Sequence, residues 1–584
     1  MDSQLDRPTR DSFKNSSGDD KISDSPYLEE TSALSCEKKD ERGSDSDRQE
    51  NAEDSRLTVT KFMVLMAMSF LWVASQIPLY LYAGISPIVI ADIGGADRYQ
   101  WIVLGNYIPL AGVTPFVGQL SDLFGRRNLA LGAALLLLVG NVVCATAKIM
   151  NIFICGMVLM GVGAGVLELT ALAVAGEMAP AKSRGIYVGA VILTVLPFAP
   201  SVLYAQFIAV NTSWRYIGLL LGGVAFIGLV LTAFLFFPPG PKTSDGLTRK
   251  QILARVDFIG GFLSIAGFTL FMAGLTWGAG LYPWTSAHTL APLVLGVALI
   301  IAFGFWEMYG AEYPMFPGEL KRSPRAFATV MVITAVSGAA FFTILVDWPT
   351  QYSHMYADSN DPMSVGVGSL PIAFCFLGGS VVVLILMSYM RSHIRLIIIV
   401  SCIVMTAGNG ALAAAGVDNL HAMFAPLVLV CFGCGAVIVP CQIIASVICP
   451  DDLIATVFAL TISVRVLGGA VGYAIYYSIL KQKFAKAAVK YIATAAVEAG
   501  IQDPKQVKEV VVLVASSARQ ELWKYVHTQG QVDALVLAGR QAYAASYPFV
   551  YYASIAFGSA AIIAACFLPD MSKFMDAHVA VEYV

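Results

Sequence analysis

The sequence predicts an all-α membrane protein with fourteen transmembrane helices. Of its 584 residues, 57% are hydrophobic and only 13% are charged, and the mean hydropathy is +0.70. Soluble domains carry about 25% charged residues, so this composition excludes an ordinary soluble protein. Fourteen apolar runs of about twenty residues follow one another, and each can cross the ~30 Å hydrocarbon core of a bilayer. Basic residues gather in alternate loops between these runs.

The residues before the first apolar run predict a disordered acidic tail. Residues 1–60 hold sixteen acidic and nine basic side chains and little apolar periodicity. This composition favours a solvated tail over a folded domain, and no short apolar core near Met1 suggests a signal peptide. The rest divides into an N-terminal six-helix bundle over 61–237, a linker, inserted helix pair and following loop over 238–326, a C-terminal six-helix bundle over 327–573, and a C-terminus over 574–584.

The fourteen spans are predicted from apolar length. Pro197 and Pro200 break the fifth one, which a membrane bundle tolerates when neighbouring groups satisfy the freed carbonyls. A long segment, 479–547, separates the last two spans; it caps the entrance, gates substrate as a lid, or lies on the membrane surface. The predicted limits are 62–84, 101–120, 129–147, 152–174, 186–209, 216–237, 258–280, 289–308, 327–347, 366–389, 395–415, 423–447, 453–478 and 548–568.

The distribution of basic residues predicts the orientation. Positive residues concentrate in cytoplasmic loops, so the richer set of loops is expected inside and both termini are expected in the cytoplasm. The predicted outer loops contain only Arg98, Lys148 and Arg215. The predicted cytoplasmic loops contain Arg126, Arg127, Lys182, Arg184, Lys242, Arg249, Lys250, Arg255, Lys321, Arg322, Arg325, Arg391 and Arg395.

A charged turn joins the second and third spans. The stretch Gly118–Arg127 reads G-x-L-x-D-x-x-G-R-R. Gly118 lets helices approach closely, and Gly125 permits a sharp reversal of the chain. Asp122 can pair with Arg126 or face a helix N-terminus. The alternative is a basic cytoplasmic turn that follows the positive-inside rule and has no further role.

Several motifs together resemble the major facilitator superfamily. The turn resembles its signature loop between helices 2 and 3, and Glu177–Gly185 resembles its E-x-x-P-x-x-x-R-G loop between helices 4 and 5. Gly161–Gly165 and Arg465–Gly472 resemble its glycine patterns in helix 4 and in the matching helix of the second half. Two departures weaken the antiporter pattern: Met157 replaces the family's arginine, and the glycines expected beside Pro197 and Pro200 are missing.

Further motifs resemble a narrower family. The motifs around Asp257–Gly260 and Trp277 resemble the extra helix pair of fourteen-helix drug:proton antiporters. Ser75–Pro78 and the ending Ala565–Asp570 are similar to the fungal trichothecene efflux pump family, which lies close to fungal siderophore transporters. The resemblance implies a major facilitator fold of two six-helix bundles plus an inserted pair. It also implies a conformational latch formed by Gly118, Asp122, Gly125, Arg126, Arg127, Glu177 and Arg184.

Two charged residues inside predicted spans are candidates for proton coupling. A charge at bilayer depth is costly and usually functional. Glu168 lies in the fourth span, where desolvation disfavours its charged form and suits a carboxyl that binds and releases a proton. Arg465 lies near the middle of the thirteenth span and could stabilise Glu168, another polar group or an anionic substrate. A structural hydrogen bond inside the membrane is the alternative for each.

The resemblance also implies a central cavity lined by spans one, four, nine and twelve. Aromatic and amide groups suit bulky, partly polar molecules, although helix packing is the plain role for each. Asp347 beside Trp348 could line an outer gate. The predicted lining residues are Gln76, Tyr80, Phe341, Phe342, Asp347 and Gln442.

The leading hypothesis is a proton-coupled exporter of a toxin, drug or secondary metabolite at the fungal plasma membrane, working by alternating access. A siderophore–iron importer driven by proton symport is the second hypothesis. No nucleotide loop, metal spacing or nucleophile triad favours an enzyme, and no ordered soluble domain favours a receptor.

The expected partners are an amphipathic small molecule and the lipid bilayer, with no nucleic acid. We expect a monomer with no cofactor and no metal site, driven by the proton gradient. Asn211 begins a glycosylation sequon in an outer loop.

Overall fold

The computed structural model describes residues 59–95, 98, 101–179, 183–238, 251, 256–278, 282–312, 314, 323–357, 363–450, 453–515 and 519–571. The predicted tail, apart from its last two residues, and the predicted C-terminus over 574–584 lie outside these ranges. Most of the linker before the inserted helix pair also lies outside them.

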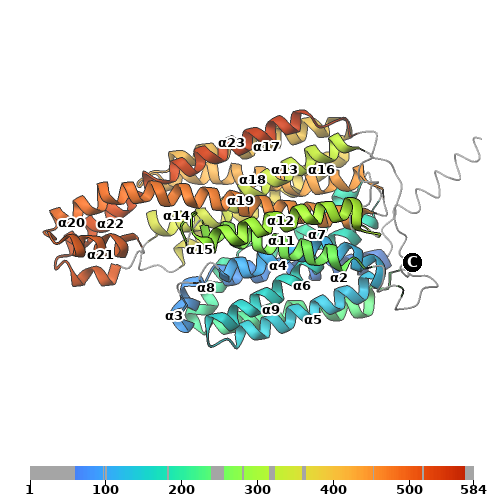
Figure 1. Cartoon of the computed structure of the whole chain (residues 1–584), viewed down its shortest axis with the longest axis horizontal. Coiled ribbons are helices and arrows are strands. Elements are labelled where there is room, and N and C mark those ends of the chain that lie inside the picture. The colour runs from blue at the N-terminus through green and yellow to red at the C-terminus, as the bar shows by residue number, and fades with distance from the viewer. Residues whose placement is uncertain are drawn as a thin grey trace, which may run out of the picture. The chain divides into compact units, whose positions relative to one another are not determined.

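The described residues form helices and connecting turns, and the fourteen predicted spans are confirmed. Fourteen helices in the described part of the chain are long and apolar enough to cross a membrane. In chain order (Figure 1) they are α2 (Val59–Ala83), α4 (Trp101–Phe124), α5 (Arg126–Ala145), α6 (Met150–Glu177), α7 (Arg184–Leu193) with α8 (Ser201–Asn211), α9 (Ile217–Leu235), α11 (Phe258–Thr276), α12 (Ala287–Phe305), α13 (Pro324–Phe342), α16 (Leu370–Tyr389), α17 (Ile394–Ala411), α18 (Leu420–Ile448), α19 (Ile454–Ala488) and α23 (Tyr547–Cys566).

The spans pack into two groups, α2 to α9 and α13 to α23, with α11 and α12 as an extra pair against α4. Small residues set the closest approaches. A Cβ added at Gly161 would overlap the carbonyl oxygen of Asn106, and one added at Gly338 would overlap that of Arg465. Glycine therefore holds α6 against α4 and α13 against α19, as small residues do at helix contacts in membranes.

The outward faces of the spans are apolar. Leu219 on α9 and Phe234 on the same helix are 75% and 74% exposed. Lipid solvates such apolar side chains but offers no hydrogen-bond partner to backbone groups. Helices that satisfy their own backbone groups and have apolar exteriors are therefore the expected form in a bilayer. The chain is a multi-pass membrane protein.

Prolines break the fifth span where the sequence predicts it. Helix α7 ends at Leu193, a 3₁₀ turn (η2, Leu196–Phe198) contains Pro197, and α8 begins directly after Pro200. Proline lacks a backbone N–H and clashes with the preceding turn, so it suits the first turn of a new helix. The helix of this span is therefore interrupted between Leu193 and Ser201, near the middle of its length.

Two span limits predicted from hydropathy are too short. Span nine continues past residue 347: α13 passes through a π-helix (η8, Thr343–Asp347) into α14 (Trp348–Met355). Span thirteen continues from residue 478 to Ala488. Lys481, Lys483 and Lys486 lower the hydropathy there, but lysine favours helix, so the helix leaves the apolar layer without ending.

The segment between the last two spans folds into a small helical cap. It contains η12 (Val489–Ala493), α20 (Thr494–Glu498), α21 (Pro504–Ala515), η13 (Arg519–Lys524) and α22 (Gln529–Ala544). Its buried side chains form a core of their own: Ala488, Ile492, Ala496, Ile501, Val510, Val514, Leu522, Val526, Val532, Leu535, Ala538 and Ala542. We call the end of the spans next to this cap the cap end, and the end with the Gly118–Arg127 turn the loop end.

Candidate functional site

A central cavity of about 160 Å³ lies between the two helix groups. Helices α2, α4, α6 and the α7–α8 break line it from one group, and α13, α16, α18 and α19 line it from the other. Of the residues predicted to line a cavity, five do so: Gln76, Tyr80, Phe341, Phe342 and Gln442.

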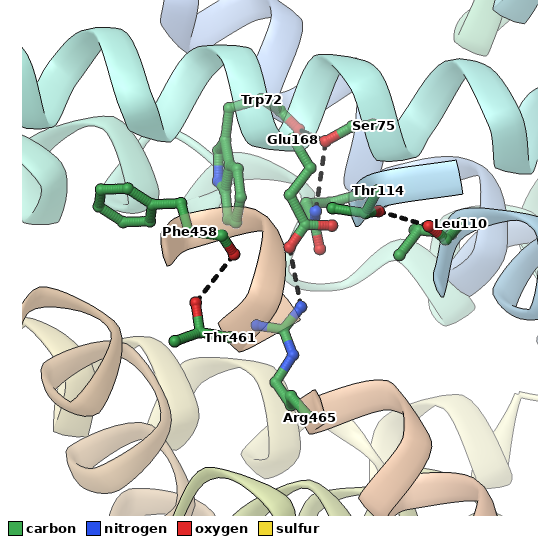
Figure 2. Close-up of polar contacts among 9 residues, drawn as sticks. Trp72, Ser75, Leu110, Thr114, Glu168, Phe458, Thr461 and Arg465 are labelled. Atoms are coloured by element: carbon green, nitrogen blue, oxygen red, sulfur yellow. Dashed lines mark hydrogen bonds and ion pairs between the residues drawn. The ribbon is translucent and has the colours of Figure 1, made fainter. Parts of the chain in front are cut away.

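Glu168 and Arg465 form an ion pair at the wall of this cavity. A guanidinium nitrogen (Nη2) of Arg465 lies 2.8 Å from Oε1 of Glu168. Figure 2 shows the two side chains pointing toward one another from α6 and α19, one from each helix group. The Glu168 side chain is 2% exposed and that of Arg465 is 20% exposed. The pair therefore links the two groups, and its arginine reaches the cavity.

Removing one member of this pair would leave an uncompensated charge. Breaking a buried pair in this way lowers the free energy of unfolding by about 3–5 kcal/mol. Two phenols lie close enough for both charges to act on them, Tyr80 on α2 and Tyr107 on α4. The wall of the cavity thus combines one acid, one permanent cation and two hydroxyl groups.

Two buried N–H donors on the cavity wall have no hydrogen-bond partner among the described residues. They are Nε1 of Trp72 on α2 and Nε2 of Gln442 on α18. Trp72 and Glu168 both line the cavity. Gln76 donates to the Ser75 hydroxyl at 3.2 Å. Since buried donors are usually paired, these two are suited to oxygen atoms of a bound molecule.

Aromatic rings form the rest of the wall. Tyr107 and Phe342 meet with centroids 4.9 Å apart, and they come from α4 and α13 on opposite sides of the cavity. Phe341 and Phe376 meet at 4.8 Å. Such rings offer large apolar surface with a few polar edges, as pockets for small molecules commonly do.

Asp347 lies apart from the cavity for which it was a candidate. It is not among the residues that line the cavity. Its side chain is 5% exposed, at the end of the π-helix η8, and Oδ2 has no hydrogen-bond partner. The phenols near it are on α19 and α23. The sequence places Asp347 beside Trp348, but only the helix packing shows that it does not line the cavity.

The predicted latch residues gather at the loop end. Gly125 has φ of 84° and separates α4 from α5. Arg126 forms an ion pair with Glu177 of α6, and Arg127 donates to the carbonyl of Ala233 at 2.6 Å. The side chain of Asp122 lies outside the described part of the structure.

One latch residue crosses between the helix groups. Arg184 donates through Nε to the carbonyl of Gly176 at 2.9 Å and through Nη1 to the carbonyl of Ser446 at 3.1 Å. Gly118 adds a second crossing: its missing Cβ would lie 3.5 Å from Cα of Thr456 on α19. The loop ends of the two groups are therefore in contact. The glycosylation candidate Asn211 is exposed at the end of α8 and donates to the carbonyl of Phe207.

Sequence reasoning missed several lining residues. Asn106 is 2% exposed within α4, and a lone amide in an apolar run is a signal that could have marked it. Trp72, Tyr107, Phe198 and Phe376 carry no such signal, because aromatic residues occur on every face of these spans. Which ones face the cavity depends on helix rotation and packing.

Comparison with known proteins gives a consistent result. The model of the family described as fungal trichothecene efflux pump matches residues 51–583. The trichothecene efflux pump TRI12 of Fusarium sporotrichioides is 26% identical over 522 residues, covering 88% of this chain and 86% of that protein. The MFS-type transporter prx5 of Penicillium rubens is 26% identical over 527 residues, covering 89% and 93%.

A solved structure supports the fold. The proton:xylose symporter XylE, a major facilitator superfamily protein, matches with a TM-score of 0.52 at 14% identity, covering 88% of this chain and 98% of that chain. At this identity the likeness concerns the fold alone. The helix arrangement is therefore the major facilitator fold, and the similar proteins are transporters rather than enzymes.

Proposed function

Because the chain belongs to the fungal trichothecene efflux pump family, we propose that it is a proton-coupled exporter of an amphipathic, oxygen-bearing natural product such as a trichothecene. The observation that carries the proposal is the Glu168–Arg465 pair on the wall of an aromatic cavity. Each helix group supplies one member, so whether the ion pair forms or breaks depends on the relative position of the two groups.

Proton coupling follows from competition for Glu168. A carboxylate can bind Arg465 or a proton, and it cannot keep its full attraction to the guanidinium once it is neutral. Protonation of Glu168 therefore weakens a contact between the helix groups and frees Arg465 toward the cavity. Re-forming the pair expels the proton. Proton binding and the arrangement of the two groups are then one coupled equilibrium.

The cavity suits a molecule with apolar bulk and several oxygen atoms. Its rings bury apolar surface, and the free N–H groups of Trp72 and Gln442 can donate to ether, ester or hydroxyl oxygens. An anionic molecule would in addition compete with Glu168 for Arg465. The name of the Fusarium relative supports a trichothecene as the first compound to test.

The cycle would be alternating access by rocking of the two helix groups about the cavity. We place the loop end, and with it both termini, in the cytoplasm, and the cap end outside the plasma membrane, on the basis of the basic loops. The chain would act as a monomer in the bilayer, driven by the proton gradient without a cofactor. The similar proteins do not favour siderophore import.

The test is export driven by an imposed pH gradient. The chain is expressed in yeast that lacks its own drug exporters, and uptake of a radiolabelled trichothecene is measured in inside-out plasma-membrane vesicles. The wild-type chain should accumulate the toxin when the vesicle interior is acidic and lose this activity when the gradient is collapsed. Glu168→Gln should abolish the accumulation, because an amide cannot release a proton.

A matched control separates coupling from folding. Glu498 is an exposed acid in the cap, so Glu498→Gln should transport like the wild type. Both variants should show wild-type abundance and a single peak in size-exclusion chromatography. Gradient-driven uptake by Glu168→Gln at the wild-type rate would remove Glu168 from the mechanism. No uptake of any trichothecene by the wild type would contradict the proposed substrate.

A further inference from the structure

A second buried polar cluster lies between α14, α19 and α23, outside the central cavity. We call it the Asp347 cluster: Asp347, Gln351, Tyr476, Tyr547 and Tyr551. Each of these side chains is at most 5% exposed. The charge of Asp347 is close enough to act on all three phenols. Gln351 is one helical turn from Asp347, and its Oε1 accepts from the Tyr551 hydroxyl at 2.5 Å.

The cluster holds an unusual share of unpaired polar atoms. Among the described residues, fourteen buried side-chain nitrogen or oxygen atoms lack a hydrogen-bond partner, and four belong to this cluster. They are Oδ2 of Asp347, Nε2 of Gln351 and the hydroxyls of Tyr476 and Tyr547. The Tyr476 hydroxyl lies beside Thr343, whose own hydroxyl donates to the carbonyl of Ala339. Unpaired buried groups on this scale call for an explanation.

The carboxyl in this cluster has no cation to balance it. No ion pair of Asp347 is found in the described part of the chain. Besides Asp347, the titratable groups that act on the three phenols are other phenols and a thiol, and His354 of α14 packs on one of them, Tyr543, with ring centroids 4.3 Å apart. Beyond the cluster itself these groups are Tyr356, Cys434, Tyr477 and Tyr543. A lone carboxylate at membrane depth is costly, so burial at this position favours the protonated form of the carboxyl.

The same cluster can also accommodate the charged form. Tyrosine hydroxyls and the glutamine amide are hydrogen-bond donors, and a carboxylate accepts several such bonds. The Gln351 amide and the Tyr547 hydroxyl are donors without partners, and Asp347 Oδ2 is an acceptor without one, so rotation of the side chains or entry of water would supply bonds to a carboxylate. The π-helix that ends at Asp347 is a feature often found at functional sites because it redirects a side chain.

The cluster is spatially separate from the Glu168–Arg465 pair. Tyr476 follows Arg465 by eleven residues on the continuous helix α19, which is about 16 Å at 1.5 Å per residue. Since α19 runs toward the cap, the Asp347 cluster lies nearer the cap end than the pair does. Helix α19 thus carries both Arg465, the partner of Glu168, and Tyr476, a neighbour of Asp347.

We propose that Asp347 is a second proton-binding site, loaded in the conformation described here and emptied when the helices around it rearrange and water enters. The ligand is a proton on Oδ2, which then donates to a neighbouring hydroxyl or amide oxygen. This site goes beyond the proposed function, which needs only Glu168. In a proton-driven exporter it would raise the number of protons moved in each cycle from one to two.

Infrared difference spectroscopy of the full-length protein in nanodiscs tests the site without any substrate. Above the ordinary carboxyl range the exposed acids are already ionised. Raising the pH from there to alkaline values should remove a carboxylic C=O band in the wild type, and Asp347→Asn should lack this band. Asp418→Asn, which changes an exposed loop acid, should keep it. A spectrum of Asp347→Asn identical to that of the wild type, or a band that does not change with pH, overturns the proposal.

A second variant protects the test against misfolding. If Asp347→Asn does not fold, Tyr547→Phe removes one donor and leaves the acid in place. The midpoint of the Asp347 band should then move to higher pH, because the charged form has lost a hydrogen-bond donor. An unchanged midpoint overturns the role given to the phenols.

Transport measurements test whether the second site adds a proton to each transport cycle, a consequence that rests on the proposed function. With the membrane potential clamped at zero, one pH unit supports a limiting accumulation of about 100-fold for two protons and about tenfold for one. The wild type should approach the higher limit with an exported trichothecene, and Asp347→Asn only the lower one. Equal limits overturn the second proton. If no trichothecene is exported, the proposed substrate fails, while the infrared bands still decide whether Asp347 binds a proton.

Discussion

The Glu168–Arg465 pair derives its importance from where its two residues are held. Glu168 is almost fully buried in α6, and its bonded partner comes from the other helix group across 297 positions of sequence. The charge of each residue is neutralised by its partner on the other helix, and not by a neighbour on its own helix. The pair is therefore sensitive to the distance between the groups.

Replacing the cation should make stability depend on pH. In Arg465→Met, Glu168 has no ion-pair partner, and folding must bury it as a neutral acid that binds a proton. The native state then binds more protons than the unfolded state, so stability falls as pH rises. The expected slope is about 1.4 kcal/mol per pH unit above the ordinary carboxyl range. Apparent melting temperatures in detergent at acidic and neutral pH measure it.

Arg465→Lys is the control for this variant, since it keeps a cation near Glu168. It should show the shallower pH dependence of the wild type. The prediction is contradicted if Arg465→Met and the wild type lose stability in parallel as pH rises.

A second acid lies outside the spans and has the opposite pH behaviour. Asp92, in the short helix α3 (Ser86–Ile93), accepts from Trp214 Nε1 at 3.0 Å and from Arg215 at 2.7 Å. These hydrogen bonds, with the charge of Arg215, lower the pKa of Asp92 below its usual value. Its stabilising effect is therefore present above the ordinary carboxyl pKa and is lost as pH falls through the lowered value.

Asp92→Asn should consequently melt slightly below the wild type at neutral pH and equally at strongly acidic pH. The effect should be small, because the carboxylate is 45% exposed and water screens it. Thermal unfolding of both proteins across the acid range measures the convergence. A difference that persists at the lowest pH would show that the amide acts through packing and not through charge.

At the scale of whole elements, helix spacing controls the site. Arg465 is held where α19 passes Gly338 of α13, and a Cβ at that position would overlap the arginine's carbonyl oxygen. Overpacked contacts of this kind typically cost about 1–3 kcal/mol. Helix α13 also carries Phe341 and Phe342, so any separation of the two helices moves the cavity wall and the ion pair together.

Gly338→Ala should therefore lower the melting temperature and reduce transport, although it adds only one methyl group. Gly223 on α9 is the matched control, because an added Cβ there meets no atom of the described residues within 4 Å. Gly223→Ala should be neutral. Equal melting temperatures for the two variants would mean that the α13–α19 contact relaxes without cost.

The elements also show what the sequence could predict. Apolar length alone located all fourteen spans, and two prolines marked the break between α7 and α8. The extension of α19 to Ala488 was missed because lysine lowers hydropathy without stopping a helix. The Asp347 cluster was missed because it needs α23, whose Tyr547 is 200 residues away in sequence and is brought close only by tertiary packing.

At the scale of the whole molecule, contacts between the helix groups occur on both sides of the cavity. Arg184 joins α7 to α18 at the loop end, and the Tyr107–Phe342 ring contact joins α4 to α13 nearer the cap end. Alternating access requires that these two contacts break in turn. The balance between them sets which side of the cavity opens.

Arg184→Gln should shift that balance toward opening at the loop end. The side chain is 1% exposed and bonds two backbone carbonyls, including that of Ser446 in the other group. Hydrogen bonds from a charged donor contribute about 1.5–3 kcal/mol, and each 1.4 kcal/mol changes an equilibrium tenfold, so a shift of about ten- to a hundredfold is expected. Hydrogen exchange should rise at the ends of α6 and α18 and stay unchanged around Tyr107 and Phe342.

Arg325 at the start of α13 is an exposed arginine, and Arg325→Gln should leave exchange at both places as in the wild type. If Arg184→Gln loosens both sides equally, the arginine stabilises the fold as a whole and does not act as a latch.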